Sequence, residues 1–155
     1  MPFQPSLFES APTLNRQALA AKVKHLSERN IFVGTSSWRY EGWLNQIYTP
    51  ERYQTHGKFS KKKFQEECIQ EYAETFSVVG ADFSFYSIPE RTFWTKVFAA
   101  APTNLKWSLK VPEDFTARRF SDQARYGARQ GLENPSFLDA DLFESMFLEP
   151  VVGHK

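Results

Sequence analysis

The chain has 155 residues, of which 41% are hydrophobic and 16% aromatic, so it is long enough to fold as one domain around a sizeable core. Its 19 basic residues nearly balance its 18 acidic residues, which excludes a global electrostatic field that would attract nucleic acid or a membrane surface. No apolar run approaches the ~18 residues of a membrane span, the first residues do not resemble a signal peptide, and the single cysteine, Cys68, excludes an intramolecular disulfide. We therefore expect a cytoplasmic protein whose one thiol is packed and inert.

Hydrophobic periodicity divides the chain into a tail and one domain. Residues 1–12 show no period and are predicted to form a disordered tail, whereas residues 13–155 are predicted to form a single domain that begins with an extra N-terminal helix. Strands and helices are then predicted to alternate, over residues 31–34, 64–76, 78–86, 89–101, 105–111 and 138–148. This order predicts an α/β fold with about three parallel strands and covering helices. The helix over residues 64–76 is predicted to expose an acidic face that includes Glu71 and Glu74.

Two connections that follow strands are unusually long. They span residues 37–60 and 112–137, whereas the connections that lead from helices into strands are very short. In parallel α/β folds, ligands bind at the carboxyl ends of the strands. We therefore expect the functional site among residues 37–60, 86–91 and 111–137.

Both long connections are rich in basic residues. Residues 51–63 contain Arg52, Lys58 and Lys61 to Lys63 against one glutamate, and residues 117–130 contain four arginines against one aspartate. Because the forked donors of arginine suit phosphate or carboxylate, these two segments, expected to converge on one face, indicate a small anionic ligand. The alternative interpretation is that the charges only keep long loops soluble.

The candidate ligand-binding residues combine hydroxyls, aromatic rings and arginines from these loops. The rings that follow the first strand could stack on a sugar or a base, or could simply cover the ends of apolar strands. No histidine lies in a motif with metal-ligand spacing, and no cofactor-binding motif is recognisable. The candidates are Ser36, Ser37, Trp38, Tyr40, Trp43, Thr116, Arg118, Arg119 and Arg125.

Strand alternation indicates where catalytic side chains would lie. In residues 78–86, the bulky positions are expected to face the helices, which leaves Asp82, Ser84 and Tyr86 on the inner face. The same alternation in residues 105–111 places Ser108 and Lys110 on that face. Asp82 and Lys110 are therefore expected to pair, either as a structural ion pair or, together with Tyr86, as candidate catalytic residues.

Three ordered motifs resemble a known family. The stretch VGTSSWRYEGW with the following IYTP, then FSFYSIP, and then LKVPEDFT are similar to the opening motifs of the domain of unknown function 72 family, the YecE-like TIM barrels. The resemblance implies a (β/α) barrel with its site at the carboxyl ends of the strands, and it implies no substrate. Gly80 and Asp82 stand where relatives commonly have glutamate and asparagine. Because a complete barrel has eight strands in about 250 residues, we expect a partial TIM barrel, truncated after its N-terminal portion.

Two classes of function are open from the sequence. The first is an uncharacterised barrel-family protein that binds or processes a small anionic, phosphorylated or sugar-like molecule, and the sequence does not decide whether it is an enzyme. The second is a nucleic-acid-binding module, in which the basic loops meet phosphates and tryptophans stack on bases. An inactive truncated product is a third interpretation. Because an open sheet leaves strand edges unpaired, the isolated chain is also expected to self-associate.

Overall fold

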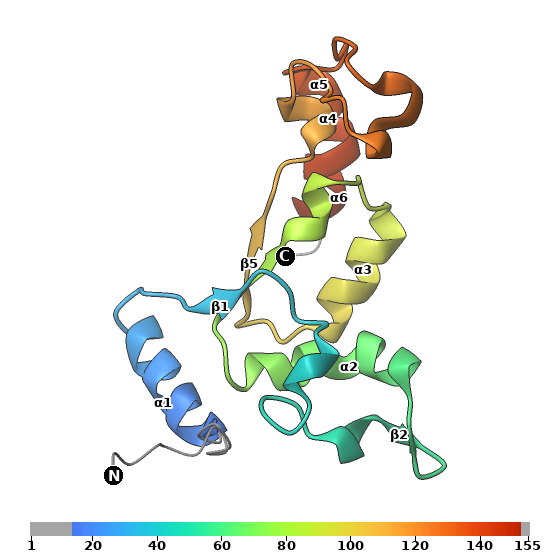
Figure 1. Cartoon of the computed structure of the whole chain (residues 1–155). Helices are drawn as coiled ribbons and strands as arrows, with labels where there is room; N and C mark the ends of the chain where they lie inside the picture. Colours follow the sequence, from blue (N-terminus) through green and yellow to red (C-terminus); the bar gives the residue numbers. More distant parts are fainter. Residues whose placement is uncertain (1–13, 153–155) are drawn as a thin grey trace, which may run out of the picture.

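The computed structural model describes residues 14–152, which form a mixed α/β fold around a small sheet (Figure 1). The three strands, named in their spatial order, are β1 (Gly34–Thr35), β4 (Val78–Ala81) and β5 (Lys106–Leu109). Both neighbouring pairs are parallel, with Val79 of β4 opposite Thr35 on one side and Trp107 on the other. The predicted parallel α/β arrangement is therefore confirmed. The described residues form an open sheet and no closed barrel.

Helical segments make up most of the remaining structure. The three long helices are α1 (Arg16–Ser27), α2 (Lys61–Ala73) and α3 (Arg91–Ala100). The shorter ones are α4 (Glu113–Thr116), α5 (Ala140–Phe143) and α6 (Glu149–Val152). Short segments of other helical types are η1 (Glu41–Trp43), η2 (Pro50–Tyr53), η3 (Asp82–Phe85), η4 (Ala124–Arg129) and η5 (Glu144–Leu148). The segments α5, η5 and α6 follow one another without a break.

Local sequence explains where the long helices begin. The side chain of Asn15 accepts a hydrogen bond from Ala18 N at 2.9 Å, and that of Ser60 accepts one from Lys63 N at 3.3 Å, so α1 and α2 each begin with a capping residue. Just before α2 lies an antiparallel hairpin of β2 (Gln54–Thr55) and β3 (Lys58–Phe59), which the sequence analysis did not predict. Its turn requires positive φ at His56 and Gly57, a geometry that suits a tight hairpin.

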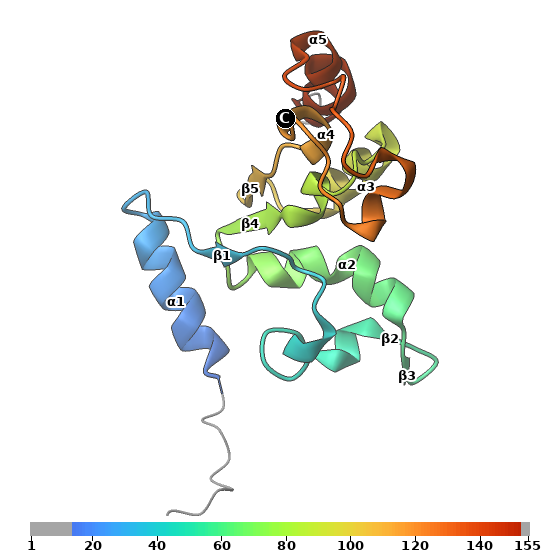
Figure 2. The same ribbon diagram turned by 45° about the horizontal axis from the view of Figure 1, so that its top comes forward.

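The core lies on the helical side of the sheet, where α2 and α3 pack (Figure 2). Phe64 and Tyr72 from α2 and Trp94 from α3 are fully buried there. Val79 and Ala81 of β4 face the same side, as strand alternation predicts. On the opposite, inner face, Lys106 and Ser108 of β5 are exposed. The sheet therefore has one covered face and one open face.

The bounds of two predicted elements differ from those that the sequence suggests. The second strand stops at Ala81 rather than at Tyr86, because the chain turns into η3, and this turn buries Ser84, which was expected on the inner face. The last helix was predicted to span residues 138–148. Leu138 instead has φ of 56° and is 71% exposed, and Met146 is also exposed. The helix therefore begins at Ala140 rather than at Leu138, because the side chain of Asp139 caps it.

Glu71 is the clearest departure from prediction within α2. It was expected on the exposed acidic face, yet it is only 1% exposed. Its carboxylate accepts hydrogen bonds at 2.7 Å from Arg16 Nη1, Thr49 Oγ1 and Tyr53 OH. Burial alone would raise the pKa of Glu71, but these hydrogen bonds outweigh burial and lower its pKa below the usual value. This Glu71 network, formed by Arg16, Thr49, Tyr53 and Glu71, ties α1 and η2 to α2.

The predicted tail over residues 1–12 lies outside the described residues. Across residues 14–152, every helix is too short or too polar to cross a membrane.

Candidate functional site

The Asp82–Lys110 pair lies just beyond the carboxyl ends of β4 and β5. Lys110 Nζ is 3.0 Å from Asp82 Oδ2, so the predicted contact between these two residues is confirmed. The Lys110 side chain is 56% exposed and that of Asp82 is 40% exposed. The pair was expected to be buried, and this expectation is wrong. Both charges are therefore open to solvent and to a ligand.

The strand register brings Asp82 and Lys110 together. Ala81 is opposite Leu109 in the parallel ladder, so the residues that follow them leave the sheet side by side. The hydroxyl of the buried Ser84 lies 2.7 Å from Ala81 O and 2.6 Å from Lys110 O, within hydrogen-bond distance of both. The contact with Lys110 O holds the backbone of Lys110 in place. Ser84, which the sequence analysis did not select, is thus a supporting residue of the site.

Gly80, which has no side chain, lies on the inner face of the sheet beside this pair. A Cβ atom at Gly80 would lie 3.1 Å from Cα of Ser36 and 3.4 Å from Thr35 O, closer than most such contacts. A glutamate at this position would therefore require β1 to move away from β4. Ser36, which lies beside Gly80, and the following Ser37 are both predicted ligand-binding residues, and both are exposed.

Arg125 is held at the same end of the sheet by a second group of polar side chains. Its Nη2 atom donates to Glu113 Oε2 at 3.0 Å and to Tyr126 OH at 2.6 Å, and Tyr126 OH in turn donates to Glu113 at 2.7 Å. The hydrogen bond with Tyr126, opposed by desolvation and supported by the charge of Glu113, raises the pKa of Arg125. Its guanidinium carbon lies 5.0 Å from the ring centroid of Tyr86, which brings a candidate catalytic residue and a candidate ligand-binding residue together.

The other predicted polar residues of the second long connection make mainly structural contacts. Arg119 Nε donates to Gly131 O at 2.5 Å, and Thr116 Oγ1 donates to Pro112 O at 3.3 Å. Arg129 pairs with Asp114 at 2.5 Å. The side chain of Arg118 is exposed and has no hydrogen-bond or ion-pair partner among residues 14–152. Much of the positive charge of this loop is therefore used within the loop itself.

The aromatic residues after β1 divide into one core residue and two surface residues. Trp38 is 2% exposed, and its ring lies edge-on to Phe83 and Trp107. This burial favours the alternative interpretation of Trp38 as a covering core ring, and its ligand-binding role stays a prediction. Tyr40 is exposed and lies edge-on to the partly buried Trp43, with ring centroids 5.3 Å apart.

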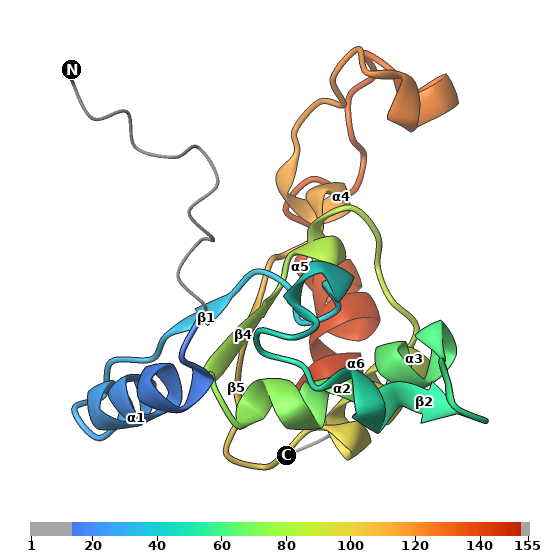
Figure 3. The same ribbon diagram turned by 60° about the horizontal axis from the view of Figure 1, so that its bottom comes forward.

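The two basic segments do not converge as expected. Figures 1 and 3 show the β2–β3 hairpin and the start of α2 well apart from the orange loop around η4. Lys61, in the first segment, pairs with Glu41 at 3.0 Å. The second segment contacts η3 and the residue after it through Arg125, whose guanidinium lies over the ring of Tyr86, four residues beyond Asp82. Tyr40, Trp43 and the lysines therefore belong to a different surface from the candidate site.

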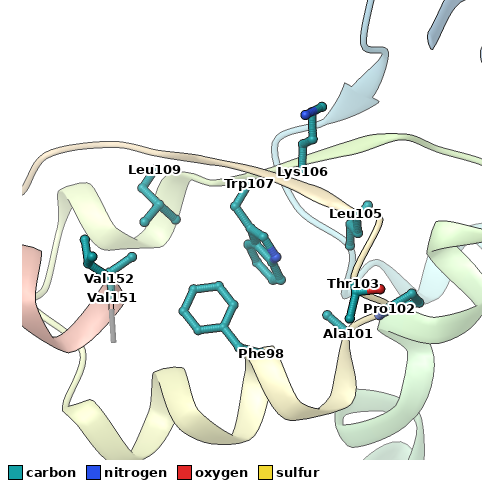
Figure 4. A pocket seen from close by; sticks show the side chains of 10 residues that line it. All are labelled: Phe98, Ala101, Pro102, Thr103, Leu105, Lys106, Trp107, Leu109, Val151 and Val152. Atoms are coloured by element: carbon teal, nitrogen blue, oxygen red, sulfur yellow. The ribbon is translucent and has the colours of Figure 1, made fainter. Parts of the chain in front are cut away.

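The main grooves of the described residues lie away from this pair. One groove of about 550 Å³ runs between α3, β5 and α6 on the helical side of the sheet (Figure 4). The candidate site is therefore an open face at the strand ends and not a closed cleft. Within residues 14–152, no cluster of three or more histidine, cysteine or acidic side chains is placed to hold a metal ion.

Comparison with known proteins gives one match. The profile of a family described as "Protein of unknown function DUF72" matches residues 32–148. No curated protein and no solved structure matches this chain. The matched range includes the three strands of the parallel sheet and the Asp82–Lys110 pair.

Proposed function

The chain belongs to the DUF72 family, whose description states no function, so we propose a function from the site alone: this protein binds a small anionic, phosphorylated or sugar-like molecule at the carboxyl end of its sheet. The observation that carries the proposal is the solvent-open Asp82–Lys110 pair. Arg125 supports it, because its guanidinium lies over the ring of Tyr86, four residues beyond Asp82 in the chain, and is oriented by Glu113.

Lys110 and Arg125 both retain hydrogen-bond donors for a ligand. An ammonium group has three donors, and the contact with Asp82 uses one of them. Within the described residues, the hydrogen bonds of the Arg125 guanidinium run through Nη2, which leaves Nε and Nη1 for a phosphate or carboxylate. Asp82 and the hydroxyl of Tyr86 add acceptors for sugar hydroxyls. This combination favours an anionic ligand that also carries hydroxyl groups.

We favour a small ligand over nucleic acid because the features of a nucleic-acid site are dispersed. Binding of single strands combines a basic groove with exposed rings. Here Trp38 is in the core, and the start of α2, where Lys61 pairs with Glu41, lies apart from the loop around η4 in Figure 3. We also limit the proposal to binding, because catalysis by Asp82, Lys110 or Tyr86 would call for a site that excludes water.

Isothermal titration of the whole chain with inorganic phosphate and glucose 6-phosphate tests the proposal. We expect Lys110→Met to weaken binding by about tenfold or more, since a hydrogen bond to a charged group contributes ~1.5–3 kcal/mol. The matched control is Lys106→Met, because Lys106 lies on the same face of β5 at its other end, over the ring of Phe32. Equal weakening by both substitutions, or no binding by the parent chain, would contradict the proposal.

A further inference from the structure

A groove between α2 and α3 lies apart from the candidate site at the strand ends. Its volume is about 540 Å³, which is within the range of small-molecule sites. The two helices pack against each other, and two residues of the loop after β1 also line the groove. Among the described residues that line it, none belongs to a strand. The groove is therefore formed without either edge of the sheet.

The walls of this α2–α3 groove are mainly apolar. Ile69 of α2 and Val97 of α3 both line it and are buried. Phe93, near the start of α3, and Ala100, at its end, line it as well. Because a helix rises about 1.5 Å per residue, residues 93 and 100 are roughly 10 Å apart along α3. An extended hydrocarbon chain can lie along this length of the helix.

Arg39 supplies a positive charge at the Phe93 end of the groove. Its guanidinium carbon lies 5.0 Å from the ring centroid of Trp38 and 5.6 Å from that of Phe93. Contacts with ring faces hold the guanidinium without using its N–H donors. Loss of water at this position lowers the pKa of Arg39. Within residues 14–152, its side chain has no carboxylate or other hydrogen-bond partner to offset that loss.

The charges at the groove favour an anion over a cation. Of the described side chains that line it, Arg39 and Lys96 are cationic and Glu66 is acidic. The forked donors of an arginine match the two oxygens of a carboxylate. The apolar walls, in contrast, offer few partners to the hydroxyl groups of a sugar. The groove therefore suits a molecule with one carboxylate and an apolar body.

From the unpartnered guanidinium and the apolar walls beside it, we propose that the α2–α3 groove binds a small organic carboxylate with an apolar chain. The carboxylate lies on the donors of Arg39, and the chain lies along α3, over Val97 toward Ala100. This proposal goes beyond the anion-binding function at the strand ends, because the two sites share no residue and take ligands of different chemistry.

The free carboxyl end of a peptide is a poorer occupant of the groove. It would offer Arg39 the same carboxylate, but its backbone N–H and C=O groups would lie against Ile69, Val97 and Ala100. Burial of peptide groups against apolar walls costs free energy unless they find hydrogen-bond partners. A hydrocarbon chain carries no such groups.

Isothermal titration of the whole chain with octanoate tests the proposal, and octylammonium, which has the same chain length, is the control ligand. We expect octanoate to bind and octylammonium to bind at least about tenfold more weakly, because its charge is repelled by Arg39 and Lys96. Two-dimensional NMR locates the ligand. Octanoate should shift the Arg39 Nε–H signal and the backbone amide signals of Val97 and Ala100, and it should leave the amide signal of Lys110 in place.

Substitutions of two exposed arginines separate a specific contact from a general loss of charge. Arg39→Gln should weaken octanoate binding about tenfold or more, since charge-assisted hydrogen bonds to the carboxylate are lost. Arg39→Lys should bind with intermediate affinity, because it keeps the charge but not the forked donors. Arg29→Gln, just after α1, is the matched control and should bind as the parent does. All three variants should keep the parent near-ultraviolet circular dichroism spectrum.

Two neighbouring glutamates of α2 provide a second matched pair. Both are exposed, but only Glu66 lines the groove, whereas Glu67 lines a separate hollow beside Arg52. Glu66→Gln should tighten octanoate binding roughly two- to fivefold by removing a like charge, and Glu67→Gln should leave it unchanged.

Several results would overturn the proposal. It fails if octanoate does not bind, if octylammonium binds equally well, or if Arg39→Gln and Arg29→Gln weaken binding to the same extent. It also fails if octanoate shifts the amide signal of Lys110 in place of the Arg39 signal, because the ligand would then occupy the strand ends. Tighter binding of N-acetylated trileucine than of octanoate would make a peptide the occupant instead.

Discussion

The Glu71 network and the Asp82–Lys110 pair both join a carboxylate to a cation, but their surroundings differ. Glu71 is 1% exposed and accepts hydrogen bonds from side chains of two other segments, at Arg16, Thr49 and Tyr53. Asp82 is 40% exposed and has Lys110 as its ion-pair partner. The buried carboxylate is fully used by the fold, whereas the exposed pair retains capacity for a ligand. This difference separates a structural charge from a candidate binding charge.

The largest effect that can sharpen this comparison comes from removing the Glu71 carboxylate. Glu71→Ala should lower the free energy of unfolding by about 3–5 kcal/mol, because it leaves the Tyr53 hydroxyl and the Thr49 N–H without their acceptor and removes one of the two carboxylates that pair with Arg16. Urea denaturation measures the change. Glu74→Ala is the control: Glu74 is three residues away and binds Arg16 and Arg52 from an exposed position, so its loss should cost under about 1 kcal/mol. Similar losses for the two variants would show that burial does not distinguish them.

The second effect is the pH dependence of stability. Because the pKa of Glu71 is lowered in the folded chain, its stabilising contribution is complete above the unfolded value of about 4.3 and is lost as pH falls through the lower folded value. We therefore expect the parent chain to lose more stability than Glu71→Gln as pH is lowered below about 4. Urea titrations of both proteins from pH 7 downward provide the measurement. Parallel curves would mean that Glu71 does not titrate differently in the folded state.

The same comparison shows what the sequence could and could not predict. The alternation of strands and helices follows from local periodicity, and so does the contact between Asp82 and Lys110, because their strands are consecutive and neighbouring. The burial of Glu71 depends on Thr49 just before η2, on Tyr53 in η2 and on Arg16 in α1, which periodicity within α2 cannot locate. The available signal was the hydroxyl residues of the preceding loop, Thr49 and Tyr53, which could donate hydrogen bonds to a buried carboxylate.

Trp38 and Ser84 illustrate a second limit of prediction. Trp38 follows the first strand in a loop, where an aromatic residue can be either a ligand platform or a core ring, and the neighbouring rings of Phe83 and Trp107 come from distant parts of the chain. Ser84 was assigned by continuing strand alternation through Tyr86. The turn into η3 after Ala81 ends that alternation and directs the hydroxyl toward two backbone carbonyls. In both cases the outcome depends on tertiary packing rather than on local pattern.

The smallest predicted effect concerns the energetic coupling of Asp82 and Lys110. Because both side chains are about half exposed, their attraction is screened by solvent, and we expect each of Asp82→Ala and Lys110→Ala to cost under about 1 kcal/mol of stability. A double-mutant cycle should give a coupling energy of about 0.2–1 kcal/mol, well below the loss expected from Glu71→Ala.

Salt concentration provides the check on this last value. If the coupling arises from an exposed ion pair, urea denaturation in 1 M sodium chloride should abolish most of it, because the Debye length falls to about 3 Å. The cost of Glu71→Ala should persist under the same conditions, since the Glu71 carboxylate and its partner Tyr53 are shielded from solvent. A coupling of about 3 kcal/mol that survives high salt would instead place the Asp82–Lys110 pair in a desolvated setting. It would then resemble the Glu71 network, and the case for a free anion-binding charge at Lys110 would fail.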